Sequence, residues 1–205
     1  PLPDDLRRRH GLLTLPRALW GVHLPDSREH LEAARRRLAF EETFYLQLGL
    51  LRQKMVWKSQ PGQELHVEGR RLSDLLAALP YALTGAQHRS LNEMLEDFAS
   101  GEPMNRLLQG DVGSGKTVVA ALLMTIVADQ GYQAAMMAPT EILAEQHFKS
   151  LSNLFESFPN APALGLLTGS TTGEEREEIY AGLADGSLQV EVGTHALIQE
   201  TVDFQ

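Results

Sequence analysis

The chain has 205 residues, of which 43% are hydrophobic and 22% charged, proportions typical of a globular protein with a sizeable core. It contains no cysteine, which excludes disulfides, cysteine-ligated zinc and a cysteine nucleophile. The net charge of −9 is uneven: residues 1–89 hold 14 Lys and Arg against 10 Asp and Glu (+4), and residues 90–205 hold 4 against 17 (−13). No stretch has the roughly 18 uninterrupted apolar residues of a membrane span, and no signal pattern opens the chain.

The N-terminal third is predicted to be mostly helical after an irregular start. Residues 1–25 hold four of the ten prolines and little periodicity, which predicts an extended lead-in. A long helix is predicted over 27–57, capped by Asp26, and a short one over 72–79. The long helix should pack along a larger body. Its apolar stripe consists of Leu31, Ala34, Leu38, Tyr45, Leu48, Leu51 and Met55.

Two arginine clusters lie in this part, at 7–9 and 35–37. They either coat a solvated helix face or contact DNA phosphates or a neighbouring domain.

From residue 80 onward, strands alternate with helices. A helix is predicted over 85–99. The strands that follow are expected at 106–109, 134–138, 163–167 and 188–192, and the helices between them at 117–129, 141–154 and 174–183. Strand followed by helix, repeated along the chain, predicts an α/β fold with a parallel sheet covered by helices. We therefore divide the chain into a helical connector, 1–79, and an α/β domain, 80–205.

Residues 110–117 read GDVGSGKT and match the phosphate-binding loop pattern G-x-x-x-x-G-K-[ST], between a predicted strand and a predicted helix. Gly113 and Gly115 permit the tight turn, so that backbone N–H groups can point at phosphate oxygens. Lys116 would reach the terminal phosphates and the Thr117 hydroxyl would bind Mg²⁺. This predicts a nucleoside-triphosphate site formed by Gly110, Asp111, Val112, Gly113, Ser114, Gly115, Lys116 and Thr117.

Gln87, upstream of this loop, has two interpretations. Its amide can donate to and accept from the edge of adenine at the same time, as glutamine does in DNA recognition. Thr84 and Gln87 also fit a capping box for the helix over 85–99, with no ligand involved. The spacing alone favours neither.

Two further segments follow predicted strands. Pro139 and Thr140 precede a helix whose exposed N–H groups could hold a nucleic-acid phosphate, although an ordinary strand-to-helix turn looks the same. Thr194 and His195 follow the last strand. No nucleophile or carboxylate pair accompanies His195, so a proton-transfer role is not expected.

Together these segments resemble the RecG family of bacterial ATP-dependent DNA helicases, in helicase superfamily 2. The resemblance rests on PMNRLLQGDVGSGKT at 103–117, MAPTEILAEQH at 137–147 and GTHALIQ at 193–199, and more weakly on RRLAFEE at 36–42. It covers residues 80–205. The transcription-repair coupling translocases share the start of the loop but typically carry Phe where Ser114 stands, which makes them the poorer match.

The resemblance implies a P-loop NTPase (RecA-like) sheet, ATP and Mg²⁺ as cofactors, and a bacterial cytoplasmic protein that remodels stalled forks and branched DNA. Gln87 would read adenine, Lys116 and Thr117 would be catalytic, and Pro139, Thr140, Thr194 and His195 would contact DNA.

The family's acidic motif was not found. Asp129 follows an apolar run but lies inside a predicted helix, and Asp203 follows no strand-like run. We therefore expect this chain to be the first part of a motor lobe, inactive by itself. The acidic motif, the second lobe and the N-terminal wedge domain would belong to a longer parent protein. The alternatives are a self-contained P-loop kinase or GTPase, for which no base-specific motif or lid is present, and a non-catalytic nucleotide- or DNA-binding module.

Overall fold

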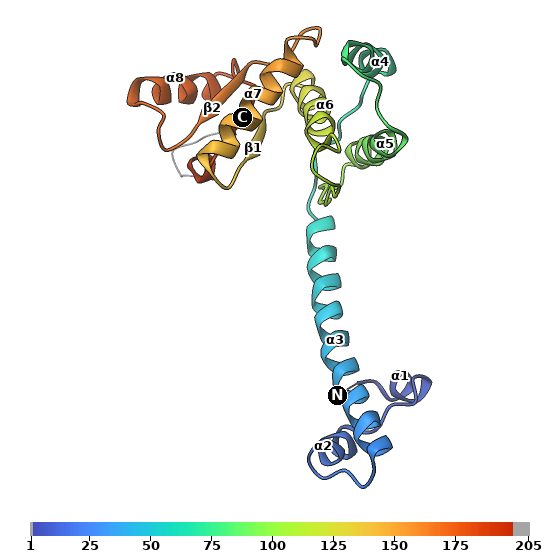
Figure 1. Cartoon of the computed structure of the whole chain (residues 1–205). Coiled ribbons are helices and arrows are strands. Elements are labelled where there is room, and N and C mark those ends of the chain that lie inside the picture. Colours follow the sequence, from blue (N-terminus) through green and yellow to red (C-terminus); the bar gives the residue numbers. More distant parts are fainter. Residues whose placement is uncertain (1, 199–205) are drawn as a thin grey trace. The chain divides into compact units, whose positions relative to one another are not determined.

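A computed structural model describes residues 2–198, and the chain forms two compact units, Pro1–Gln60 and Pro61–Gln205 (Figure 1). This division lies before the predicted boundary at 79/80, because the helix preceding Pro80 packs into the core of the second unit. The functional boundary at 79/80 stays a prediction.

The first unit contains α1 (Asp4–Arg9), α2 (Leu15–His23) and α3 (Arg28–Lys58). The predicted irregular lead-in is therefore wrong. Pro16 lies in the first turn of α2, where its missing N–H would have no helical partner in any case. In α1, acidic residues occupy the first turn and arginines the last, which suits the helix dipole.

The bounds of α3 agree with the predicted 27–57 to within one residue, but the predicted cap is wrong. Ser27, not Asp26, caps the helix: its Oγ accepts a hydrogen bond from the His30 backbone N–H at 3.1 Å. The Asp26 carboxylate lies 3.1 Å from the His30 ring nitrogen Nδ1 instead.

Only the N-terminal half of α3 is sheltered. Ala34 and Arg37 are buried where α2 packs against the helix (Figure 1). Further along the predicted apolar stripe, Tyr45, Leu48 and Leu51 are about half exposed, and Met55 is 72% exposed. Packing of this stripe along a larger body stays a prediction.

A buried ion pair holds the first unit together. The Arg37 guanidinium, 1% exposed, donates to the Leu13 carbonyl at 2.9 Å and to the Glu41 carboxylate at 2.6 Å. The hydrogen bond from Arg37 lowers the pKa of Glu41. Because the carbonyl belongs to the segment between α1 and α2, the arginine fixes that segment to α3.

The second unit begins with α4 (Gly69–Ala78), α5 (Gly85–Ala99) and α6 (Lys116–Asp129). Strand β1 (Ala134–Met137), α7 (Glu141–Phe155), β2 (Leu164–Leu167), α8 (Gly173–Ala184), β3 (Val190–Gly193) and the 3-10 turn η1 (His195–Ile198) follow. The strands form a parallel sheet in the order β1-β3-β2. The predicted α/β architecture is confirmed, with every helix from 85 onward within one residue of its predicted bounds.

The predicted strand at 106–109 is wrong, since this segment has no regular secondary structure. A strand needs a neighbour for its ladder of hydrogen bonds. None of the three described strands pairs with residues 106–109, so this segment has no ladder.

The main core lies on one face of the sheet. Val190 and Val192 of the central strand are fully buried there, together with residues of α4, α5, α6 and α7. On the other face, Leu167 packs with Leu197 and with Ile179 and Tyr180 of α8. Glu191, between the two valines, points to this second face and is fully buried.

Arg71 of α4 joins three parts of the second unit. Its guanidinium bonds both Asp129 oxygens at the end of α6, at 2.6 and 2.9 Å, and donates to the carbonyls of Pro159 and Asn160.

Among the described residues no helix has the length and apolar character that a membrane crossing requires.

Replacing Arg37 by leucine should destabilise the first unit by about 2 kcal/mol, because the charge-assisted hydrogen bonds from this buried guanidinium to the Leu13 carbonyl and the partly buried Glu41 carboxylate are lost. Urea denaturation followed by tryptophan fluorescence measures this, since Trp20 and Trp57 both lie in the first unit. Arg35→Leu, at an exposed position on the same helix, is the control and should change the free energy of unfolding by less than about 0.5 kcal/mol.

The stability of the second unit should fall as the pH rises from about 5 to about 8. Burial raises the pKa of Glu191 from 4.5 to about 8. In this window the unfolded chain releases the Glu191 proton while the folded chain retains it, so stability is lost as the pH approaches the folded-state value. Glu191→Gln should flatten this part of the profile, measured by urea denaturation with circular dichroism. An unchanged slope would contradict the assignment.

Candidate functional site

The loop over 110–117 leads directly into α6. Gly113 and Gly115 have φ angles of +78° and +79°, in the left-handed region that favours glycine, and Gly115 occupies the N-cap of α6. At Gly110 a Cβ would come within 2.6 Å of the Ser114 Oγ. The sequence places glycine where the backbone requires it, and the N–H groups at the start of α6 lie at the positive end of the helix dipole.

The Lys116 ammonium lies within the curve of this loop. Its Nζ donates to the carbonyl oxygens of Gly110 and Asp111, both at 2.8 Å. Thr117 follows in the first turn of α6 and is half-buried. A cation and a hydroxyl are thus presented beside the N-terminus of a helix, the arrangement that a triphosphate and its metal ion need.

The structure brings Gln87 to the same loop. Its Oε1 accepts from the Thr84 backbone N–H at 2.7 Å, which completes the predicted capping box of α5. Its Nε2 donates to the Ser114 carbonyl at 2.8 Å. A Cβ on Gly115 would overlap this nitrogen, so the amide can approach because residue 115 is glycine. The capping interpretation is confirmed, and the same side chain also touches the phosphate-binding loop.

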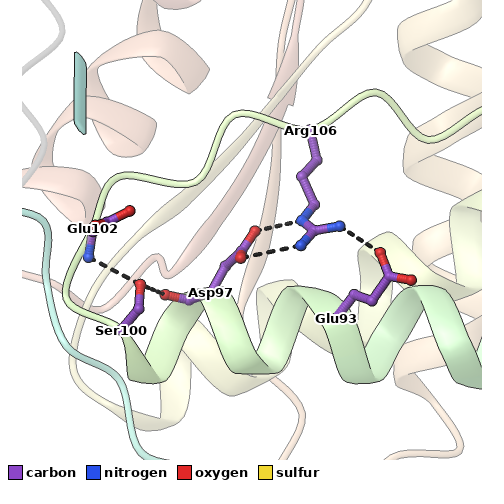
Figure 2. A network of polar contacts seen from close by, with 5 residues as sticks. All are labelled: Glu93, Asp97, Ser100, Glu102 and Arg106. Atoms are coloured by element: carbon purple, nitrogen blue, oxygen red, sulfur yellow. Dashed lines mark hydrogen bonds and ion pairs between the residues drawn. The ribbon is translucent and has the colours of Figure 1, made fainter. Parts of the chain in front are cut away.

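Arg106 fixes the segment that enters the loop (Figure 2). Its guanidinium lies between two carboxylates on one face of α5: it forms a paired contact with Asp97 and a 2.5 Å contact with Glu93. The hydrogen bond to Asp97 is the main reason that the pKa of Arg106 is raised. Since α5 also carries Gln87 at its N-terminal end, one helix holds both the entry to the loop and the amide that contacts it.

The predicted DNA-contacting residues gather at the carboxyl edge of the sheet. Pro139 and Thr140 follow β1, and Thr194 and His195 follow β3. The two strands are parallel neighbours, joined at this end by a hydrogen bond from the Ala138 N–H to the Gly193 carbonyl at 2.8 Å. Thr140 is the N-cap of α7, accepting from the Leu143 N–H at 3.3 Å.

A third segment reaches this edge that was not predicted as part of the site. Residues 168–171 follow β2, and their hydroxyls bond one another, Thr168 to Ser170 at 2.8 Å. The Thr194 N–H donates to the Leu167 carbonyl at 3.2 Å, which ties the segment to the end of β3. The sequence signal was a Gly-Ser-Thr-Thr run directly after a predicted strand. Nothing in the sequence pointed to Arg106, because its partners lie 9 and 13 residues away on a predicted helix, a spacing that no local pattern connects to the segment entering the loop.

The described residues supply only part of a metal site. Thr117 offers a hydroxyl, but no group of three potential metal ligands (His, Cys, Asp or Glu) occurs between residues 2 and 198. Asp129 lies at the end of α6 opposite Lys116, which agrees with its predicted position inside the helix. Its carboxylate is bound to Arg71. Asp203 lies outside the described residues.

Comparison with known proteins gives consistent results. The chain is 48% identical over 206 aligned positions to an ATP-dependent DNA helicase RecG of Synechocystis sp., covering 100% of this chain and 24% of that protein. The RecG proteins of Thermotoga maritima and Bacillus subtilis are 44% and 45% identical, again over 100% of this chain and over 26% and 30% of theirs. The chain thus spans about a quarter to a third of the length of these curated relatives.

A solved structure of RecG bound to a three-way DNA junction superposes with a TM-score of 0.87 at 44% identity, over 99% of this chain and 28% of that one. The family model for DEAD/DEAH box helicases matches residues 84–204, which include Gln87, the phosphate-binding loop and the strand-end segments. The chain therefore belongs to the DEAD/DEAH box helicase family.

Proposed function

We propose that this chain carries the ATP-binding part of an ATP-dependent DNA helicase or translocase that remodels branched DNA in recombination and repair. The observation that carries the proposal is the contact between Gln87 and the phosphate-binding loop. It puts an amide able to read adenine next to a cation able to bind phosphates. The RecG relatives, and the RecG structure with a three-way DNA junction, support the choice of reaction and substrate.

In this proposal ATP binds along the N-terminus of α6. Loop N–H groups and Lys116 hold the phosphates, and Thr117 contributes one oxygen to Mg²⁺. None of the three described strands ends in an Asp-Glu pair. The Mg²⁺-binding carboxylate and the one that prepares the attacking water would come from the rest of a longer cytoplasmic protein, as would the second motor lobe and the wedge domain.

The DNA path would follow the carboxyl edge of the sheet. Pro139, Thr140, Thr194 and His195 lie there, on neighbouring parallel strands. Backbone N–H groups at the start of α7 and the hydroxyls of the two threonines suit contacts to phosphate and sugar rather than to bases. Such contacts allow travel along DNA of any sequence.

In the full-length protein, Lys116→Ala should lower DNA-stimulated ATP hydrolysis by on the order of 100-fold or more, because a preorganised positive charge at the transferring phosphate is removed. Branched-DNA binding, measured by gel shift, should change little, since Lys116 is held inside the loop. Lys149→Ala, at an exposed position of α7, is the matched control. Equal loss of hydrolysis and DNA binding would count against the proposal.

Gln87→Ala should weaken ATP binding roughly tenfold and GTP binding much less, because ATP alone loses the base contact, while the loss of the hydrogen bonds to Ser114 and Thr84 affects both nucleotides. Thr84→Ala separates this role from helix capping: it removes the hydroxyl that caps α5, at about 1 kcal/mol of stability, and leaves the glutamine in place. Binding measured by calorimetry should show the loss of ATP preference in the first variant alone. The same loss in both variants would assign Gln87 to capping.

A further inference from the structure

Glu191 is an unusual residue for the middle of a sheet. It lies on the central strand β3, is 0% exposed, and neither of its carboxyl oxygens has a hydrogen-bond partner among the described residues. A buried polar group without a partner is costly to stability unless something supplies one. Burial accordingly raises the pKa of this carboxyl.

The neighbouring strand leaves space for this carboxyl. Gly165 of β2 is the register partner of Glu191, and a Cβ on Gly165 would overlap the Glu191 Oε2. The carboxyl therefore lies over the backbone of the glycine, in space that a side chain at position 165 would fill.

Strand β2 is an edge strand in the described sheet, and on its outer side the Leu166 carbonyl accepts from the Thr171 hydroxyl at 3.5 Å, which leaves the Leu166 N–H and the backbone groups of Leu164 for a further strand. The carbonyls of Ala163 and Leu167 accept from the N–H groups of Val190 and Thr194, at 2.9 and 3.2 Å. Since the direction of backbone groups alternates along a strand, Leu164 and Leu166 direct theirs away from β3. An edge of this kind can accept another strand.

A groove of about 680 Å³ runs along this edge, lined by residues 163–166 of the strand and by side chains of α7 and α8. Its charged lining residues are all acidic: Glu145 on α7, and Glu175 and Glu178 on α8. No Lys, Arg or His is among the described residues that line it. The groove therefore suits a positively charged occupant.

We propose that the β2 edge binds an extended basic peptide segment of a partner protein, which adds to the sheet as a further strand and directs a Lys or Arg across Gly165 to the Glu191 carboxyl. Backbone hydrogen bonds to Leu164 and Leu166 would supply affinity, and the acidic walls and Glu191 would supply selectivity.

The geometry of an added strand fits this reach. Neighbouring strands lie about 4.8 Å apart, and residues side by side in a sheet direct their side chains to the same face. The residue beside Gly165 in the new strand would face α8, as Glu191 does. The four-carbon stem of lysine spans the distance to a carboxyl that already lies over Gly165. Its ammonium would give Glu191 the partner that it lacks, in surroundings where water screens the charge little.

The proposal is tested with a labelled heptapeptide of alternating valine and lysine, a glutamate counterpart of the same pattern, and the 205-residue chain. Fluorescence anisotropy should show binding of the basic peptide alone. Hydrogen exchange of the Leu164 and Leu166 amides should slow on binding, because these groups become paired. Binding of the acidic peptide to the same extent, or protection confined to other parts of the chain, would overturn the proposal.

Three variants locate the contact. Glu191→Gln, which replaces the ionisable carboxyl by an amide of the same size, should weaken binding roughly tenfold, because the charge-assisted hydrogen bond to the bound cation can no longer form. Glu145→Lys combined with Glu178→Lys reverses the charge of two exposed wall positions and should also weaken binding. Glu177→Lys, exposed on α8 but outside the groove, is the matched control and should not. Unchanged affinity in Glu191→Gln would show that the carboxyl receives no ligand.

Discussion

The candidate nucleotide site depends on the left-handed backbone of Gly115. This residue ends the phosphate-binding loop and caps α6 with a φ of +79°, a conformation that side chains other than glycine rarely adopt. Its missing side chain leaves the space that the Gln87 amide occupies. The next residue is Lys116, so the turn at Gly115 also sets the position from which the lysine side chain extends into the loop. The phosphate-binding loop, the start of α6 and the side chain of Gln87 thus meet at Gly115.

Arginines at two places fix the surroundings of that turn. Arg106 holds the segment entering the loop to Asp97 and Glu93 of α5, the helix that carries Gln87 in its first turn (Figure 2). Arg71 holds the far end of α6 to α4 and to the loop after α7. Each guanidinium is partly exposed, so its direct contribution to stability is modest. The effect of both is to restrict how α5 and α6 can move relative to the loop, which matters for a site whose groups must be in place before a nucleotide arrives.

The central strand β3 serves both faces of the sheet in different ways. Val190 and Val192 pack into the main core, and their burial fixes the register of the strand, because a shift by one residue would turn both valines to the other face. Glu191 lies between the two valines, so its side chain must face the opposite side of the sheet. The absence of a side chain at Gly165 allows the carboxyl to be placed there. Because burial raises its pKa to about 8, this carboxyl is mostly a neutral acid near physiological pH. A cation bound beside it would favour the charged carboxylate and be held by it.

The phosphate-binding loop, the capping box at Thr84 and the alternation of strands and helices could be predicted from the sequence, because each is encoded by residues close together in the chain. Two local predictions were wrong. The proline-rich start forms α1 and α2, and Ser27 rather than Asp26 caps α3. The tertiary structure alone decided that 106–109 is not a strand, since strand formation requires a neighbour. It also decided that Gln87 reaches Ser114, that Arg106 reaches α5, and that Glu191 lies over Gly165. Those contacts join residues of different elements, and the packing of helices and the pairing of strands bring them together.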